Sequence, residues 1–185
     1  MRAEFIKKAA FLLIGRSKFI DESGVNLGFT RIKGRARPGQ RVTEGVPSHS
    51  GKKLTLIAAI GLSGISAEWM VEGAMDGEAF ETYIKQVLLP TLRRGDILLM
   101  DNLTVHKASW LEDFLQSHGV RLEYLPPYSP DLNPIELCWS KVKSILRSLK
   151  PRTVEDLQKA LKKAFRSISI IDICRWFRHC GYPLH

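Results

Sequence analysis

Four apolar residues between two aspartates, near the middle of the chain, leave few choices for its fold. Residues 96–101 read Asp-Ile-Leu-Leu-Met-Asp. A strand with one wet face alternates apolar and polar residues, whereas a continuous apolar run is typical of a parallel strand buried on both faces. The run therefore predicts a central parallel strand in a sheet that helices cover on both sides.

Patterns on either side of this run predict strands first and helices later. Residues 18–23 indicate a short strand that ends in acidic residues. Residues 54–60 and 67–71 indicate two strands joined by a glycine turn, and residues 120–125 a further strand. Helices are expected over residues 76–89, 109–118 and 134–149, after the capping residue Thr153, and over residues 170–179.

This order predicts an α/β fold with a mixed sheet, antiparallel early in the chain and parallel late. The 185 residues suffice for one domain with a single core. We expect residues 1–17 to be a linker or remnant, residues 18–150 to hold the domain, and residues 151–185 to extend it as a helical tail. No apolar run is long enough to cross a membrane, and three cysteines without a CxxC motif give no disulfide framework.

Positive charge lies in two flanks around an acidic middle. Residues 1–53 carry 12 basic and 4 acidic residues, residues 54–140 carry 5 and 12, and residues 141–185 carry 11 and 3, which gives +8, −7 and +8. Basic surfaces attract phosphates, and clustered carboxylates attract divalent cations. A protein that cuts nucleic acid with bound metal needs both, although a solvated basic surface explains the charge alone equally well.

Two basic stretches are candidates for DNA contacts. Residues 31–41 hold five cations, no acid, two glycines and a proline, and are therefore expected to form a loop. The second stretch lies in and after the helix expected at residues 134–149. The candidate DNA-binding residues are Arg31, Lys33, Arg35, Arg37, Arg41, Lys141, Lys143 and Arg147.

Three acidic residues from separate elements are candidates for one metal site. Asp21 and Asp101 are expected at the carboxyl ends of strands, where ligand sites gather in open sheets, and Glu136 in the first turn of the helix after the last strand. Two-metal phosphodiester chemistry needs such converging carboxylates. Ionised carboxylates also suit Mg²⁺, which prefers oxygen ligands.

Position alone leaves other roles open for these acids. Asp21 and Asp101 suit turns, and Glu22 is an alternative ligand beside Asp21. Glu136 stands three residues after an N-cap residue, which is the capping-box position for glutamate. Asp131 is a fourth acid, but it lies between prolines and suits a turn.

Three strings of the sequence resemble the motif blocks of DDE-type transposases. They are FIDESG, LLMDNLTVH and LEYLPPYSPDLNPIELCWSKVK, which carry Asp21, Asp101 and Glu136 in that order. The 34 residues between Asp101 and Glu136 are typical of the bacterial insertion-sequence branch of the mariner-like superfamily. The resemblance covers about residues 18–150.

This resemblance implies a ribonuclease H-like fold with Asp21, Asp101 and Glu136 as catalytic triad and metal ligands. It implies a cofactor of two divalent ions, which are Mg²⁺ or Mn²⁺. It also implies cut-and-paste DNA transposition of an insertion sequence, insertion at TA dinucleotides, and a homodimer on paired DNA ends. A chain of this kind is expected in the bacterial cytoplasm, associated with the nucleoid.

Neighbours of the triad become supporting residues in this interpretation. Asn102 and His106 belong to the second motif block, where His106 orients a carboxylate, touches a phosphate or merely starts a helix. Asn133 fixes the helix that carries Glu136. Trp139 is expected in the core rather than stacked on DNA.

The start of the chain departs from the resemblance. Family members carry a helix-turn-helix DNA-binding domain before the catalytic domain, whereas 20 residues without that motif precede Asp21 here. We therefore expect either a separately encoded helix-turn-helix half or a decayed fragment. A non-catalytic DNA- or partner-binding remnant is the main alternative, and a cellular ribonuclease H or resolvase is another.

Overall fold

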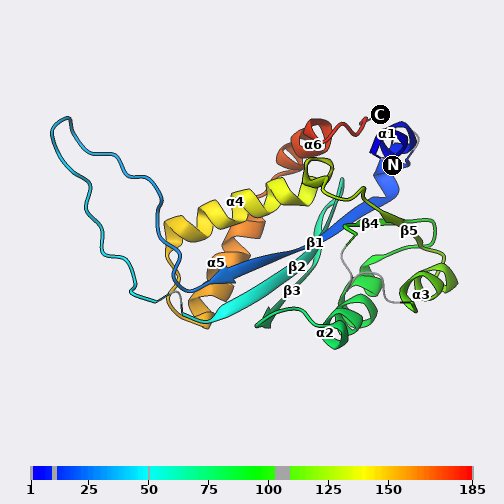
Figure 1. Ribbon diagram of the computed structural model, residues 1–185, viewed down its shortest axis with the longest axis horizontal. Coiled ribbons are helices and arrows are strands. Elements are labelled where there is room, and N and C mark those ends of the chain that lie inside the picture. The colour runs from blue at the N-terminus through cyan, green and yellow to red at the C-terminus, as the bar shows by residue number, and fades with distance from the viewer. Residues whose placement is uncertain (1, 10–11, 50, 103–108, 185) are drawn as a thin grey trace.

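The computed structural model describes residues 2–9, 12–49, 51–102 and 109–184 (Figure 1). Within these residues, five strands form one sheet in the order β3-β2-β1-β4-β5. Their bounds are β1 (Ser17–Asn26), β2 (Lys53–Gly61), β3 (Gly64–Glu72), β4 (Ile97–Met100) and β5 (Arg121–Tyr124).

The sheet is mixed as predicted. β1 pairs antiparallel with β2, and β2 antiparallel with β3. β1 pairs parallel with β4, and β4 parallel with β5. All four residues of β4 are at most 4% exposed, which confirms the buried central strand expected from the apolar run.

Six α-helices surround this sheet in the described part of the chain. They are α1 (Arg2–Ala9), α2 (Gly77–Thr82), α3 (Leu111–Ser117), α4 (Pro134–Leu149), α5 (Val154–Arg166) and α6 (Ile170–His179). α4 has the predicted bounds, and α6 does too. The helix expected over residues 76–89 is α2 followed by wider π-helical turns from Tyr83 to Leu88.

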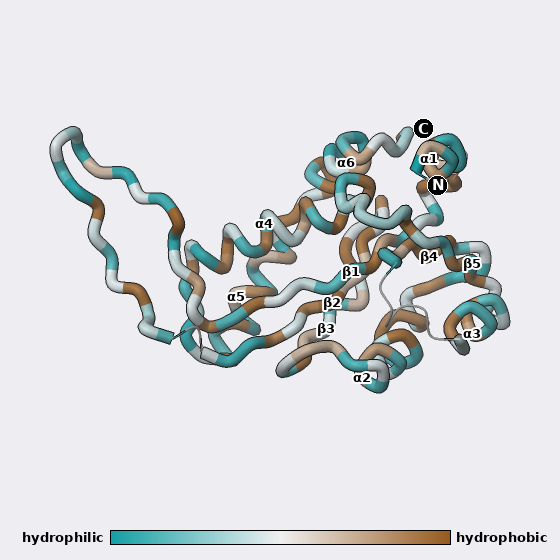
Figure 2. Tube along the Cα trace, viewed as in Figure 1, coloured by the Kyte–Doolittle hydropathy of each residue, from teal (hydrophilic) through white to brown (hydrophobic). Residues whose placement is uncertain are grey.

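Two hydrophobic clusters, rather than the expected single core, lie on the two faces of the sheet. Phe19 and Leu99 belong to the cluster shared with α4, α5 and α6. Ile20 and Leu98, their neighbours in β1 and β4, belong to the cluster shared with α2 and α3. This alternation follows the two-residue period of a strand, and helices lie over both faces of the sheet (Figure 1). Hydrophilic and hydrophobic residues alternate along these helices (Figure 2).

The first helix packs onto the domain. Phe5 and Ala9 of α1 are 8% and 7% exposed and join the cluster on the α4 face. Arg2 donates to the Ser129 hydroxyl at 2.8 Å and forms an ion pair with Asp131 in the turn before α4. The structure therefore ties the N-terminal residues to the segment that precedes Glu136.

Residues 27–52 form a long excursion between β1 and β2 that projects away from the sheet (Figure 1). In its described part no helix or strand forms, as the glycines and proline predict. Its base is held by Arg152, which donates to the carbonyls of Leu27 and Phe29, each at 2.9 Å. An ion pair between Glu44 and Lys150 fixes the returning arm.

Candidate active site

Asp21 lies in the middle of β1, and not at its end as the sequence predicted. β1 runs on to Asn26 because its antiparallel pairing with β2 continues that far. The parallel pairing with β4 stops earlier, at Phe19 opposite Leu99. Asp21 and Asp101 each lie two residues beyond that pair, so they occupy matching positions on the same face of the sheet.

α4 brings Glu136 to this face. Pro134 occupies the first helical position, where its missing N–H leaves no hydrogen bond unmade. Ile135 and Trp139, four residues apart, are 1% and 2% exposed and turn one stripe of the helix into the core. Glu136 is exposed in the first turn, beside this stripe.

The turn before α4 is anchored from the far end of the chain. The buried Tyr182 hydroxyl donates to the Leu132 carbonyl at 2.7 Å. Phe19 packs against Tyr182 with ring centroids 5.0 Å apart, so this anchor is tied to the strand that carries Asp21. The start of α4 is therefore tied to β1 through Tyr182 and to α1 through Arg2.

The three candidate acids line one cavity of ≈ 370 Å³. Asp21 is 9% exposed, Asp101 half-buried and Glu136 exposed, so the site passes from the sheet out to solvent. Asn102, Asn133 and the proline-rich turn of residues 125–130 complete its walls. The structure thus brings together five of the six residues that the sequence assigned to catalysis and its support. The sixth, His106, lies outside the described residues.

The donor set of this cavity fits a hard divalent cation. Three carboxylates and two amide side chains offer the oxygen ligands that Mg²⁺ prefers. Among the residues that the structure describes, no three His, Cys, Asp or Glu side chains lie close enough together to hold a metal ion. The carboxylates therefore share a cavity without forming a closed coordination shell.

Asn133 differs in one respect from the prediction. It occupies the N-cap position of α4, but its side chain makes no capping hydrogen bond. Its backbone carbonyl accepts from the Glu136 N–H at 3.1 Å. The backbone thus supports the helix start, and Asn133 lines the cavity.

The basic candidates divide into exposed and engaged residues. Four side chains of the excursion are exposed, namely Lys33, Arg35, Arg37 and Arg41. Arg31, also exposed, donates to the Ser148 hydroxyl at 3.5 Å. The Arg147 guanidinium lies 5.5 Å from the ring centre of Phe29, and Lys143 is half-buried on α4.

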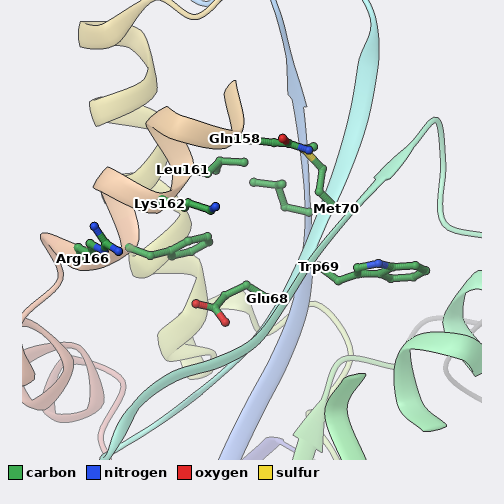
Figure 3. Close-up of a pocket in the computed structure, with 9 residues that line it drawn as sticks. Glu68, Trp69, Met70, Gln158, Leu161, Lys162 and Arg166 are labelled. Carbon is green, nitrogen blue, oxygen red and sulfur yellow. The ribbon is translucent and has the colours of Figure 1, made fainter. Parts of the chain in front are cut away.

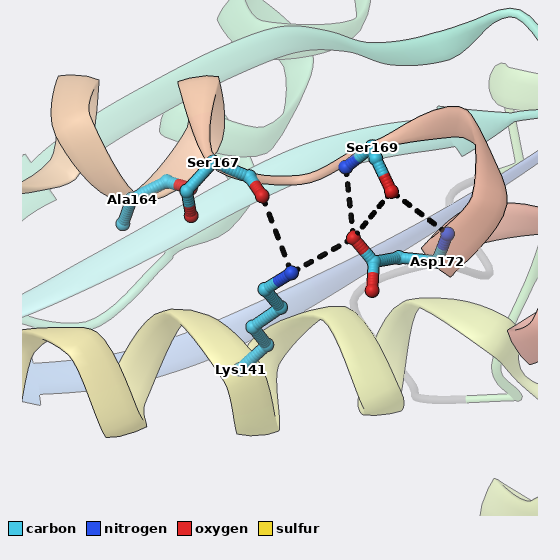
Figure 4. Close-up of polar contacts among 5 residues, drawn as sticks. All are labelled: Lys141, Ala164, Ser167, Ser169 and Asp172. Carbon is cyan, nitrogen blue, oxygen red and sulfur yellow. Dashed lines mark hydrogen bonds and ion pairs between the residues drawn. The ribbon is translucent and has the colours of Figure 1, made fainter.

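Lys141 has a partner within the chain that the sequence did not predict (Figure 4). Its ammonium lies 2.8 Å from the Asp172 carboxylate and donates to the Ser167 carbonyl at 3.2 Å. The same Asp172 oxygen accepts from the backbone and hydroxyl of Ser169, at 2.9 and 2.7 Å. Lys141 thus holds α4 against the start of α6, so we do not include it in the proposed DNA surface.

A larger cavity of ≈ 570 Å³ lies between β3 and α5 (Figure 3). Leu161 and Met70 supply apolar walls, and Lys162 and Arg166 of α5 also line the cavity. Glu68 is its one acidic residue. This cavity offers too few carboxylates for two-metal chemistry, so its size does not make it the candidate site.

Hydrogen bonds between residues far apart in the sequence hold the wall of the candidate site, and the sequence did not predict them. Arg2 reaches Ser129 and Asp131 across more than 120 positions, and Tyr182 reaches Leu132 across 50. No local pattern marks such pairs. The aromatic character of Tyr182 close to the last helix was the one available signal, and it is equally consistent with core packing.

A five-stranded mixed sheet in this order, flanked by helices, is the ribonuclease H-like fold. Carboxylates from its first strand, from the end of β4 and from the start of α4 meet at one cavity. Such an arrangement of carboxylates suits metal-dependent phosphodiester chemistry. The chain belongs to the DDE superfamily endonucleases, whose family model matches residues 16–158.

Curated relatives of the chain are transposases. It is 29% identical over 89 residues to the transposable element Tc1 transposase of Caenorhabditis elegans, covering 48% of this chain and 33% of that protein. It is 26% identical over 166 residues to the Tcb2 transposase of Caenorhabditis briggsae, covering 83% and 61%. The chain thus spans less than two thirds of the length of these relatives. Both are nematode proteins, so the predicted bacterial branch is not confirmed.

Solved structures with the same fold come from the mariner Mos1 transposase. The Mos1 paired end complex with Mn matches with a TM-score of 0.77 at 19% identity, over 97% of this chain and 58% of that one. The Mos1 catalytic domain matches with a TM-score of 0.68 at 17% identity, over 97% and 82%.

The described part of the present chain contains no helix that is both long and apolar enough to span a membrane.

Proposed function

We propose that this chain is the catalytic domain of a DNA transposase, which cleaves and transfers DNA strands in cut-and-paste transposition of an insertion sequence. The carrying observation is that Asp21, Asp101 and Glu136 line one cavity inside the family-matched segment. The Tc1 and Tcb2 relatives are transposases, which supports the same class of reaction.

In this proposal Asp21, Asp101 and Glu136 are the metal ligands, and Asn102 and His106 are supporting residues. When these residues hold two Mg²⁺ or Mn²⁺ ions, the ions would activate the attacking oxygen and stabilise the leaving oxygen. Asp21 lies in β1 and Asp101 directly follows β4, the parallel neighbour of β1, while Glu136 lies on the solvent side. One carboxylate set can therefore serve both water attack and attack by a 3′-hydroxyl.

DNA is the proposed substrate and partner. The exposed cations of residues 31–41 project on an arm that carries no regular structure, which suits contact with phosphates or with a second protomer (Figure 1). Lys143 and Arg147 on α4 are proposed to contact DNA closer to the cavity. One of the similar Mos1 structures is a paired end complex, which supports a homodimer on DNA.

Finer features of the proposal follow the family resemblance alone. They are insertion at TA dinucleotides, a separately encoded helix-turn-helix half, and a place in the bacterial cytoplasm beside the nucleoid. The domain boundaries proposed from the sequence are residues 1–17, 18–150 and 151–185.

Nicking of supercoiled plasmid tests the proposal. We expect the chain to nick in the presence of Mg²⁺ or Mn²⁺, and we expect Asp101→Asn to abolish this activity. Asp113→Asn, an exposed aspartate on α3, is the matched control and is expected to nick normally. Nicking that persists in Asp101→Asn, or that needs no metal, contradicts the proposal. Salt-sensitive DNA binding without nicking, also when the helix-turn-helix half is supplied, favours the non-catalytic remnant.

A further inference from the structure

Asn133 places a buried amide in the wall of the carboxylate cavity. It precedes α4 directly, and its residue is 3% exposed. It lines the same cavity as Asp21, Asp101 and Glu136. A buried side chain of this kind normally has its polar atoms paired.

The side-chain oxygen of Asn133 has no such pairing. Its Oδ1 is buried and has no hydrogen-bond partner in the described structure. The usual explanation for asparagine at this position, a hydrogen bond to the first turn of the helix, does not apply. Leaving a buried acceptor unsatisfied costs about 1–3 kcal/mol. The fold therefore retains a polar oxygen at a place where it contributes nothing to the helix.

Backbone contacts already hold this position without the side chain. The Asn133 N–H donates to the Pro130 carbonyl at 3.0 Å, and the Asn133 carbonyl accepts from Glu136 at 3.1 Å. Pro134 fixes the helix start from the next position. The Oδ1 of Asn133 therefore has no part in holding the start of the helix.

We propose that Asn133 Oδ1 is a fourth oxygen donor to the divalent cation site, either as a direct ligand or through one bound water. Amide oxygens are accepted ligands of hard divalent cations. Because the amide is neutral, it adds a donor without adding negative charge to a cavity that must also admit a phosphate. This inference rests on the proposed function, since it takes the three carboxylates as the main ligands.

Mn²⁺ binding, measured by electron paramagnetic resonance or calorimetry, tests this role without any activity assay. We expect Asn133→Ala to weaken Mn²⁺ binding about tenfold, the usual cost of losing an outer partner of a metal site. Asn133→Asp is expected to bind Mn²⁺ at least as tightly as the unchanged protein, because it keeps an oxygen at the same place. Asn133→Ala should not unfold at a lower temperature than the unchanged protein, because the lost oxygen has no hydrogen-bond partner in the described part of the protein.

Three results distinguish a failure of the Asn133 proposal from a failure of the proposed function. Equal Mn²⁺ affinity in Asn133→Ala and the unchanged protein, with binding lost in Asp101→Asn, overturns the role of Asn133 and leaves the proposed function standing. Weak binding in both Asn133→Ala and Asn133→Asp, with a lowered melting temperature, shows a merely structural residue and also overturns it. Mn²⁺ binding that Asp101→Asn does not affect contradicts the proposed function itself.

Discussion

Replacing Asp172 by alanine should loosen the contact between α6 and the helix that carries Glu136. One oxygen of Asp172 accepts three hydrogen bonds, from Lys141 at 2.8 Å and from the backbone and hydroxyl of Ser169 at 2.9 and 2.7 Å (Figure 4). The Ser169 hydroxyl in turn accepts from the Asp172 N–H at 3.1 Å, which completes a capping box. The substitution removes the ion pair and half of the cap together.

The expected loss of unfolding free energy is about 1–2 kcal/mol. The lost half of the helix cap contributes about 0.5–1 kcal/mol. An ion pair whose side chains are 33% and 25% exposed adds a few tenths to about 1 kcal/mol. For a domain of this size, each kcal/mol corresponds to about 2–4 °C of melting temperature, so we expect a decrease of about 2–8 °C.

Asp156→Ala is the matched control. Asp156 occupies the same third position in α5 and donates its N–H to the Thr153 hydroxyl at 3.1 Å. No reciprocal hydrogen bond or ion pair of its carboxylate is found in the described structure. We expect this variant to lose only the interaction with the helix dipole, about 0.5 kcal/mol. Urea unfolding of both variants measures the difference, and equal losses would refute the reasoning.

The pH dependence of the Asp172→Ala effect gives a second check. Lys141 first, and then the Ser169 backbone and hydroxyl, hold the pKa of the Asp172 carboxyl below its ordinary value. A lowered pKa in the folded state stabilises the protein above the unfolded pKa of about 3.9, and this contribution is lost as pH falls below it. The stability difference between the unchanged protein and Asp172→Ala should therefore be full at pH 7 and shrink towards pH 3. A difference that stays constant over this range contradicts the assignment.

Two further predictions concern the anchor of the α4 turn and the basic excursion. Tyr182→Phe should lower the unfolding free energy by about 1–2 kcal/mol in urea titrations, because a buried carbonyl loses its donor, while the fully exposed Tyr128→Phe should leave it unchanged. The double substitution Arg35→Ala and Arg37→Ala should weaken DNA binding and reduce the slope of log affinity against log salt by about 2, since each phosphate contact contributes about 0.9. The control is Lys85→Ala, in the helical turns that cover the other face of the sheet from α4, and it should keep the slope. An unchanged slope in the double variant would show that the excursion does not contact DNA.

Local sequence signals were sufficient for α4 and β4. Pro134 and the stripe through Trp139 specify where the helix begins and which side faces the core, and both are properties of neighbouring residues. Pro151, one residue beyond the left-handed Lys150, ends it. The unbroken apolar run of β4 indicated burial on both faces, which the structure confirms.

Features that depend on distant partners were not predictable from the sequence. The length of β1 beyond Asp21 is set by pairing with β2, and no residue near Asp21 signals it. Phe5 and Ala9 of α1 are buried in the cluster on the α4 face, and Arg2 pairs with Asp131, which is more than 120 residues away in the sequence. Asparagine is a common N-cap residue, so the type of residue 133 predicts a cap. In the structure its side chain makes no capping hydrogen bond, and the residue lines the cavity.

Iron-directed backbone cleavage tests the central claim most directly, namely that three separate segments meet at one divalent cation site. Fe²⁺ bound in place of Mg²⁺, with ascorbate and peroxide, generates radicals that cut the nearest backbone. The account predicts three groups of cuts, near Asp21, Asp101 and Glu136, which excess Mg²⁺ suppresses and Asp101→Asn eliminates. Cuts confined to one of these segments, or cuts elsewhere that Mg²⁺ suppresses equally, would contradict it.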